Sequence, residues 1–422
     1  MKVKIEPGAL CGTVTAPPSK SLTHRKLICS ALSGRPCRIE NVMLSEDILA
    51  TMDCLSALGA EISRSGNTVT VDGSGIFVQT RPVHMPCRAS GSTLRFLLPV
   101  VLALGRPAVF DGEASLFCRP LGYYEDLCRN QGILWEKGAD SLSVSGRLQA
   151  GTFEIPGERS SQFVTGMLFA LPMLPGQSEI RLIPPVTSRP YIRMTQAVLR
   201  DFSIRAISVG DDAFHIPAHQ KYRPHNTRVE GDWTNGAVLL ALNLLNGGLK
   251  INGLDERSVQ GDTVSNRWLQ ALARSRATFD LTDNPDLAPL LMACAAALHG
   301  VVLNGAGRLQ YKESDRGAAM AAELEKFGAT VFVDDDRIWV DSNHLHRPTS
   351  ELVAHSDHRI AMSLAVLCTL YGGTIRGAEA VDKSWPGFFD VLRGLGLSVT
   401  EENDPEPAAL PAGGENEHES GL

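Results

Sequence analysis

The chain has 422 residues, of which 43% are hydrophobic and 21% are charged; this length exceeds what one hydrophobic core usually serves and predicts two domains. No stretch reaches the roughly 18 apolar residues of a membrane span, and the first residues lack the apolar segment of a secretory signal, so we expect a cytoplasmic protein with no membrane partner. The formal net charge of −7 argues against nucleic-acid binding through bulk positive charge.

The negative charge is concentrated at the end of the chain. Residues 401–422 contain seven acidic residues and no Lys or Arg. Subtracting these seven from the total of 47 leaves 40 acidic residues against 40 basic ones in residues 1–400. Because this end is rich in Pro, Gly and Glu, its composition predicts an acidic, disordered tail over residues 401–422.

The cysteines and histidines do not form a recognisable metal motif. The nine cysteines are scattered and form no Cys-x-x-Cys pair, which argues against both a zinc site and a disulfide framework. His344 with His346, and His355 with His358, lie close in sequence, but no H-E-x-x-H pattern accompanies them. We therefore expect no metal.

Six segments along the chain share one order of features: a helix, a glycine that ends it, and an apolar strand. The glycine is the usual C-terminal signal of a helix, and the apolar residues after it indicate a buried strand. The six predicted helices are 21–32, 93–104, 161–171, 234–245, 287–298 and 358–370.

A second helix follows in each segment, and the clearest segments end in a hairpin. Residues 331–333 and 338–340 flank three aspartates and predict a strand–turn–strand unit. Six such units in order predict an α/β (α+β) protein of two similar domains with three repeats each, divided at the polar stretch 219–226. The second helices are predicted at 48–58, 123–129, 195–201, 266–274, 318–327 and 388–394.

The polar residues that could carry chemistry gather where these helices begin. A helix N-terminus favours Ser and Asp caps, which is enough to explain Ser160, Asp232 and Asp286. It does not explain cations, since the dipole disfavours each one in a first turn by ~0.3–1 kcal/mol. A bound anion would draw on both the N–H groups and the cations, so the pattern predicts two small ligands with several negative groups. The cations assigned to first turns are Lys20, Arg25, Arg95, Arg316 and Arg359.

Eight short blocks between residues 7 and 395 carry most of these polar residues. They are Pro17-Pro18-Ser19-Lys20-Ser21 with Arg25, Gly91-Ser92-Thr93-Leu94-Arg95, Asp111-Gly112-Glu113 with Arg119-Pro120, Ser160-Ser161-Gln162, Ser188-Arg189-Pro190-Tyr191, Lys312-Glu313-Ser314-Asp315-Arg316, Asp357-His358-Arg359 and Lys383-Ser384-Trp385-Pro386. In content and order they resemble the enolpyruvylshikimate-phosphate synthase family, the 3-phosphoshikimate 1-carboxyvinyltransferases.

The resemblance implies two similar domains, each of three βαβαββ repeats arranged like an inverse α/β barrel, with the active site in the interdomain cleft. It implies an N-terminal domain over 17–228 and a C-terminal domain over 1–16 plus 229–400. The implied reaction transfers the enolpyruvyl group of phosphoenolpyruvate to the 5-hydroxyl of shikimate 3-phosphate and releases phosphate, in the shikimate pathway of aromatic amino-acid biosynthesis. The resemblance also implies a monomer that needs no metal or organic cofactor, and sensitivity to glyphosate.

Site residues follow from the matching motifs. Those implied to bind shikimate 3-phosphate are Lys20, Ser21, Arg25, Ser160, Ser161, Gln162, Ser188, Tyr191, Asp286 and Lys312. Those implied to bind phosphoenolpyruvate are Lys20, Gly91, Arg119, Gln162, Arg316, Arg359 and Lys383. Lys20, Asp286 and Glu313 are implied to be catalytic, because the reaction moves protons at C3 of the enol ether and at the 5-hydroxyl.

Some positions depart from the commonest family pattern. His24 stands where Asn is frequent, Ala89 also replaces an Asn, and Phe96 replaces a frequent Pro. Arg308 stands where an Asn often contacts the substrate, which leaves that contact open.

Two other functions compete with this interpretation. The sister enzyme that acts on UDP-N-acetylglucosamine carries a Cys five residues before the loop arginine, where this chain has Ala114. A catalytically idle anion-binding protein on the same scaffold is the other alternative. Loss of activity should first remove the proton-transfer residues, but Lys20, Asp286 and Glu313 are all present.

Overall fold

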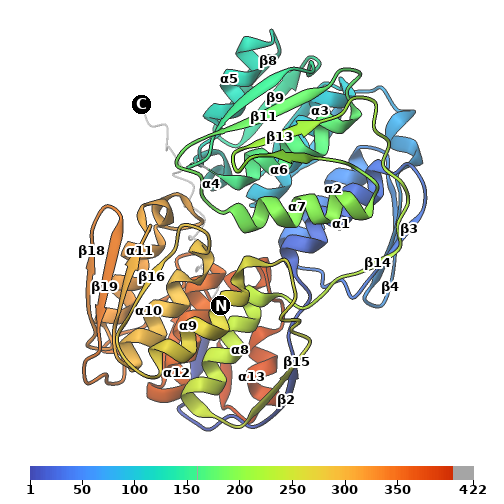
Figure 1. The fold of residues 1–422 in the computed structure, drawn as a ribbon. Helices are drawn as coiled ribbons and strands as arrows, with labels where there is room; N and C mark the ends of the chain where they lie inside the picture. The colour runs from blue at the N-terminus through green and yellow to red at the C-terminus, as the bar shows by residue number, and fades with distance from the viewer. Residues whose placement is uncertain (159, 403–422) are drawn as a thin grey trace, which may run out of the picture.

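The computed structural model describes residues 1–158 and 160–402, and in it the chain forms two lobes, stacked one above the other in Figure 1. Buried hydrophobic residues fall into two separate clusters. One draws on residues 22–229 and forms the core of the first lobe; the other draws on residues 3–16 and 237–399 and forms the core of the second. The predicted boundary at 16/17 falls between these clusters, whereas Val229, just beyond the predicted boundary at 228/229, still belongs to the first cluster. Both boundaries remain a prediction.

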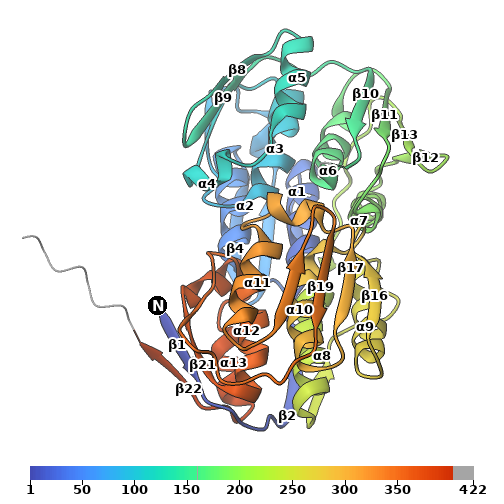
Figure 2. The ribbon, with the colours of Figure 1, turned by 90° about the vertical axis from the view of Figure 1, so that its left-hand side faces the viewer.

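The first residues of the chain belong to the second lobe. Strand β1 (Lys2–Ile5) lies between β21 (Gly373–Arg376) and β22 (Val399–Glu402), and Figure 2 shows this edge of the lower lobe. The chain then crosses to the first lobe beside the segment that returns from it. Ser19 N–H donates to the carbonyl of Glu230 at 2.9 Å, and Asp232 N–H donates to that of Pro17 at 2.7 Å.

The helices confirm the predicted pairs in order. The first helices of the units are α1 (Lys20–Leu32), α3 (Gly91–Leu104), α6 (Ser161–Ala170), α8 (Trp233–Asn246), α10 (Ala288–Ala297) and α12 (His358–Tyr371). The second helices are α2 (Glu46–Ala57), α5 (Gly122–Asn130), α7 (Arg189–Asp201), α9 (Val264–Leu272), α11 (Arg316–Glu325) and α13 (Phe388–Gly394), with the short α4 (Ala114–Phe117) before α5. The 3-10 turns are η1 (Ser74–Phe77), η2 (Leu171–Met173), η3 (Gly261–Thr263), η4 (Pro285–Leu287), η5 (Gly307–Tyr311) and η6 (Ala378–Lys383).

The sheets repeat one topology. In the described chain, five sheets have four strands each, ordered as one parallel pair followed by two antiparallel pairings, and the fourth unit pairs only β15 with β2. Strands of the first lobe are β3 (Cys37–Glu40), β4 (Glu61–Ser65), β5 (Thr68–Asp72), β6 (Val83–Pro86), β7 (Ala108–Asp111), β8 (Leu134–Lys137), β9 (Ser141–Ser145), β10 (Thr152–Pro156), β11 (Ser178–Ile183), β12 (Ile207–Val209), β13 (Ala213–Ile216) and β14 (Thr227–Arg228). Besides β1, β21 and β22, the second lobe has β2 (Gly12–Thr15), β15 (Leu249–Asn252), β16 (Ala277–Asp280), β17 (Val301–Asn304), β18 (Thr330–Val333), β19 (Arg337–Asp341) and β20 (Leu352–Val353).

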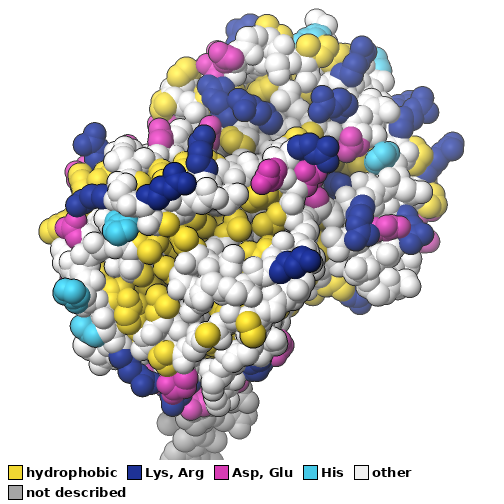
Figure 3. Space-filling view, turned by 60° about the horizontal axis from the view of Figure 1, so that its bottom comes forward, with side chains coloured by type: hydrophobic (Ala, Val, Ile, Leu, Met, Phe, Trp, Pro, Cys, Tyr) yellow, Lys and Arg dark blue, Asp and Glu magenta, His cyan; other side chains and the backbone are white. Residues whose placement is uncertain are grey.

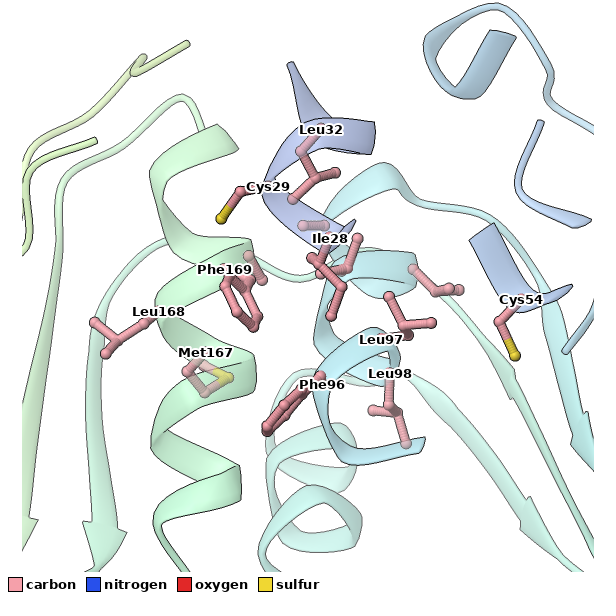
Figure 4. Packing of buried hydrophobic residues seen from close by; sticks show 14 of the residues in the cluster. Ile28, Cys29, Leu32, Cys54, Phe96, Leu97, Leu98, Met167, Leu168 and Phe169 are labelled. Carbon is pink, nitrogen blue, oxygen red and sulfur yellow. The ribbon is translucent and has the colours of Figure 1, made fainter. Parts of the chain in front are cut away.

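The first helix of each unit is largely enclosed within its lobe. Every residue of α1 from Leu22 onward is buried, as is α12 from His358 to Thr369. Figure 4 shows how α1, α3 and α6 meet: Ile28, Phe96 and Phe169 point into one space, and the rings of the two phenylalanines lie 5.7 Å apart, edge to face. Because these helices are enclosed on nearly all sides, the sheets lie outside them.

Several boundaries differ from the sequence predictions, and two of these differences have a structural reason. Helix α7 begins at Arg189 instead of residue 195, because Pro190 occupies its first turn, where a missing N–H costs nothing. The predicted tail does not begin at residue 401. Glu401 and Glu402 belong to strand β22, which pairs with β1 in the sheet, and Arg393 forms an ion pair with Glu401. The rest of that prediction, residues 403–422, lies outside the described residues.

The close packing of α3 against α6 generates a stability prediction. Pro99 lacks the N–H that would bond the carbonyl of Arg95 within α3, and the hydroxyl of Tyr124 donates to this carbonyl instead, at 2.7 Å. Gly166 of α6 lies directly against this bond, so a Cβ there would overlap both oxygens and lie 2.9 Å from Pro99 Cγ. We expect Gly166→Ala to destabilise the fold by about 1–3 kcal/mol, measured by denaturant unfolding.

The matched control is Gly151→Ala, because no atom lies within 4 Å of a Cβ built there. It should change stability by less than about 0.5 kcal/mol. Equal stability of the two variants would contradict the proposed contact.

Candidate active site between the two lobes

A single cavity of about 780 Å³ lies between the lobes and is lined by residues from both. All of the site residues predicted from the sequence lie on its wall. Those from the first lobe are Lys20, Ser21, Arg25, Gly91, Arg119, Ser160, Ser161, Gln162, Ser188 and Tyr191. Those from the second lobe are Asp286, Lys312, Glu313, Arg316, Arg359 and Lys383.

The cavity forms where helices of both lobes begin, as expected. Lys20 is the first residue of α1, and Arg316 and Arg359 lie in the first turns of α11 and α12. Arg25 and Arg95, however, are the sixth and fifth residues of their helices, so the expectation that they lie in first turns is wrong. Both helices begin earlier than predicted, since Ser19 and Ser90 cap them.

The three positions first explained as caps behave differently from one another. Ser160 accepts from the N–H of Gln162 at 3.2 Å, and Asp232 accepts from that of Asn235 at 2.8 Å. These two are N-caps. Asp286 caps no helix: its Oδ1 accepts from Lys312 Nζ at 3.1 Å and from Arg316 Nη1 at 2.7 Å.

Arg316 is the centre of a buried ionic cluster. Its side chain is 1% exposed, and besides Asp286 it meets Glu313 Oε2 at 2.8 Å and Asp357 Oδ2 at 2.8 Å. A buried guanidinium is tolerated only when its charge and its N–H donors are matched, and this requirement explains the three carboxylates.

The cluster keeps the two expected proton-transfer carboxylates ionised. Burial alone would raise the pKa of Asp286, but Lys312 and Arg316 hold it well below its ordinary value. Burial also acts to raise the pKa of Glu313, and Arg316 with Arg119 holds it well below normal. Without a ligand, both groups are therefore proton acceptors.

Other cations on the cavity wall have no carboxylate partner among the described residues. Arg359 Nη1 donates to Asn235 Oδ1 at 2.9 Å, and Lys383 Nζ donates to the carbonyl of Ser356 at 3.2 Å. Arg25 likewise bonds only neutral oxygens. Because bonds to neutral groups leave most of a cation's charge available, these side chains can bind the anionic groups of a ligand.

Lys20 is the exception, since it is paired. Its Nζ lies 2.7 Å from Asp47 Oδ2 and 3.4 Å from the carbonyl of Lys383, so it connects the two lobes.

Neutral donors line the side of the cavity nearest α7. Ser188, just before α7, has a φ of 56° and makes no cap bond with its side chain. Its N–H donates across the lobes to the carbonyl of Thr282 at 3.0 Å. The hydroxyl of Tyr191 lies 3.3 Å from Asp286 Oδ2 and 3.4 Å from Asp262 Oδ2. Burial and these two carboxylates raise the pKa of Tyr191 well above normal, so it acts as a donor.

Three residues that shape the site were not among the substrate-binding and catalytic residues predicted from the sequence, although Arg95 was among the cations expected to meet an anion. Asp47 pairs with Lys20, and no sequence motif marks it. Asp357 forms an ion pair with Arg316. Its position in the Asp357-His358-Arg359 block could have marked it as a site residue. Arg95 Nη1 donates to Gln162 Oε1 at 2.7 Å, and its buried Nε has no partner among the described residues.

The described part of the chain shows no cluster of three or more His, Cys, Asp or Glu side chains that could hold a metal ion. Over the same residues, none of the helices has the length and apolar character needed to cross a membrane. On the outer surface, Lys and Arg are interspersed with Asp and Glu over the face that Figure 3 shows.

The fold and cavity define a class: a two-lobed α/β protein of repeated units that binds anionic small molecules at helix N-termini. The EPSP synthase (3-phosphoshikimate 1-carboxyvinyltransferase) family profile matches residues 5–392. Proteins named 3-phosphoshikimate 1-carboxyvinyltransferase from Clostridium kluyveri and Clostridium acetobutylicum are 38% and 37% identical to the chain, in each case over 94% of this chain and 98% of the relative. The chain belongs to the EPSP synthase family and is a transferase.

Solved structures share the fold. An EPSP synthase from Acinetobacter baumannii superposes with a TM-score of 0.77 at 23% identity, over 95% of this chain and 100% of that one. The enolpyruvyl transferase NikO from Streptomyces tendae superposes with a TM-score of 0.74 at 18% identity, over 94% of this chain and 98% of that one. The predicted α/β fold in two similar lobes is confirmed.

His24, beside the site, generates a prediction about acid stability. Burial lowers its pKa from 6.5 to about 3, with Lys20 and Arg25 acting in the same direction against Asp47. In the folded protein His24 stays neutral down to about pH 3, whereas in the unfolded chain its imidazole takes up a proton below about pH 6.5. The free energy of unfolding therefore falls as the pH drops from 6.5 toward 3. Between about pH 7 and pH 5 this residue should account for a loss of about 2 kcal/mol.

His24→Asn should remove this contribution to the difference in unfolding free energy between about pH 7 and pH 5. The measurement is denaturant unfolding of the variant and the wild type at both pH values, and it compares the differences, so an effect of the substitution at neutral pH does not matter. His299→Asn is the control, because His299 is exposed and should leave the pH dependence unchanged. The same slope in the wild type and in His24→Asn would contradict a neutral buried imidazole.

Proposed function

We propose that this chain transfers the enolpyruvyl group of phosphoenolpyruvate to the 5-hydroxyl of shikimate 3-phosphate, giving 5-enolpyruvylshikimate 3-phosphate and phosphate. The observation that carries the proposal is the single cavity that holds both the ionised carboxylates of Asp286 and Glu313 and several cations with no carboxylate partner among the described residues. Two polyanionic substrates match such a wall, and the family relationship names the reaction.

The two substrates are assigned to different parts of the wall. Shikimate 3-phosphate would be held by the hydroxyls of the α6 and α7 N-termini and by side chains of α1 and the loop before α11: Ser21, Arg25, Ser160, Ser161, Gln162, Ser188, Tyr191 and Lys312. Phosphoenolpyruvate would be held by Gly91, Arg119, Gln162, Arg316, Arg359 and Lys383. Lys20 and Asp286 lie where both could be reached.

The reaction needs one proton removed and one added before phosphate leaves. The 5-hydroxyl oxygen attacks C2 of phosphoenolpyruvate and gives up its proton, while C3 gains one. The tetrahedral intermediate then loses phosphate, and C3 returns a proton, which gives the enol ether of the product. Asp286, ionised and held by Lys312, is suited to accept the hydroxyl proton. Substrate anions on Arg119 and Arg316 would weaken the field that keeps Glu313 ionised, and this would let Glu313 carry the proton exchanged at C3.

We also propose that the enzyme works as a cytoplasmic monomer without a metal or organic cofactor. In support, every site residue comes from one chain, and the reaction described above involves only proton transfers and the loss of phosphate. We propose domain boundaries at 17–228 and at 1–16 plus 229–400, because the two hydrophobic cores divide close to these positions, between residues 16 and 22 and between residues 229 and 237.

Activity measurements test the proposal and its two rivals. The purified protein should release phosphate from phosphoenolpyruvate when shikimate 3-phosphate is present. It should not do so with UDP-N-acetylglucosamine, and turnover with the UDP-sugar alone would overturn the assignment. Glu313→Gln keeps the shape of the side chain but removes its proton chemistry, so kcat should fall about 10²-fold or more with little change in the Kd of shikimate 3-phosphate. A wild type that binds both substrates without turnover would support the anion-binding alternative.

Gly91 generates a prediction about the phosphoenolpyruvate side of the cavity and about glyphosate. A Cβ at this position would lie 2.9 Å from Arg119 Nη1 and 3.3 Å from Arg95 Nη1, so the guanidinium of Arg119 would have to move. Gly91→Ala should raise the KM of phosphoenolpyruvate about tenfold, because a small misplacement of a binding group weakens binding strongly. It should weaken glyphosate inhibition in parallel, with the KM of shikimate 3-phosphate nearly unchanged.

Gly151→Ala, which adds a methyl group in open space, should leave all three constants as in the wild type. Glyphosate inhibition that does not respond to phosphoenolpyruvate concentration in the wild type would show that the two do not share this site.

A further inference from the structure

Arg308 reaches from the second lobe to the wall of the first. It belongs to η5, and its Nη1 donates to Ser188 Oγ at 3.0 Å and to the carbonyl of Thr282 at 3.3 Å. Ser188 is free to accept this bond, because its hydroxyl makes no cap bond to α7. Arg308 therefore lies at the edge where the two lobes meet, on the lining of the cavity.

Several N–H donors of the Arg308 guanidinium, and its positive charge, are not matched by described protein groups. Among the described residues, no carboxylate forms an ion pair with it. Its Nε is buried without a partner, and Nη2 donates to no described protein group. The acidic groups nearest to it are occupied elsewhere: Asp286 binds Lys312 and Arg316, and Asp283 Oδ1 accepts the N–H of Arg189 at 3.0 Å.

A cation that is partly removed from water and has no counter-charge is costly, and an anion in the cavity would relieve that cost. The hydroxyl of Ser188, which accepts from Arg308, is one of several hydroxyls on the cavity wall, together with those of Ser160, Ser161 and Tyr191. A guanidinium on a wall that also carries hydroxyls matches the three terminal oxygens of a phosphate monoester better than it matches a single carboxylate.

We propose that Arg308 binds the 3-phosphate of the acceptor substrate and strengthens the preference for the phosphorylated over the unphosphorylated compound. This inference rests on the proposed function, since it takes shikimate 3-phosphate as the acceptor. It assigns a charge-assisted contact to the position where the sequence departs from the Asn that is frequent in the family. Arg308 is then a specificity-determining residue that takes no part in proton transfer.

The test compares Arg308→Asn, Arg308→Lys and a control, Arg274→Asn. Arg274 is exposed beyond the end of α9 and lies outside the cavity, so the control removes the same charge without touching the site. The measurements are the KM of each substrate, kcat, and calorimetric Kd values for shikimate 3-phosphate and for shikimate.

Arg308→Asn should raise the Kd and KM of shikimate 3-phosphate about tenfold to a hundredfold, because a hydrogen bond to a charged group is lost. The Kd of shikimate, the KM of phosphoenolpyruvate and kcat should stay near the wild-type values. Arg308→Lys keeps the charge but loses the planar arrangement of N–H donors, so its Kd for shikimate 3-phosphate should lie between those of the wild type and Arg308→Asn. Arg274→Asn should match the wild type.

An unchanged Kd for shikimate 3-phosphate in Arg308→Asn would overturn the inference while leaving the proposed function intact. An equal rise in the Kd of shikimate and of shikimate 3-phosphate, together with a lower melting temperature, would show that Arg308 only connects the lobes. This result would also overturn the inference. Failure of the wild type to turn over shikimate 3-phosphate would instead refute the proposed function. In that case the calorimetric comparison still decides whether Arg308 recognises the phosphate.

Discussion

The site depends on the need to neutralise one buried cation, Arg316. Its three carboxylate partners come from separate places in the second lobe: Asp286 from η4, Glu313 from the loop before α11, and Asp357 from the start of α12. Satisfying this one guanidinium therefore fixes how the starts of these elements lie relative to one another. It also keeps Asp286 and Glu313 ionised, and it prevents them from neutralising the other cations on the wall.

The consequence is a cavity that holds both kinds of group that enolpyruvyl transfer requires. Proton acceptors are present because Arg316 and Lys312 lower the pKa values of the two carboxylates. Anion-binding groups are present because Arg359 and Lys383 bond only neutral oxygens within the described chain. A change that disturbed the central cluster would be expected to affect both properties together.

The repeated unit explains why the cavity lies between the lobes. Each unit directs a helix N-terminus toward the junction, so the polar starts of α1, α6 and α7 face those of α11 and α12. The lobes already touch on the α7 side, where Ser188 and Arg189 donate N–H bonds to Thr282 and Asp283. At the same edge, the side chain of Arg308 in the second lobe donates to Ser188 in the first. A substrate that contacts both residues would therefore be held by both lobes.

The sequence by itself determined the order of helices and strands, the family and the membership of the cavity wall, because periodicity, caps and short motifs are local properties. It allowed a capping role for Asp286 beside the catalytic one, placed Arg25 and Arg95 in first turns, and began the tail within β22. Only the tertiary structure decided which charges are paired. Arg316 and Asp357 are 41 residues apart, and Lys20 and Asp47 are 27 apart. Ion pairing is set by distances in space and by burial, and a pattern along the chain specifies neither.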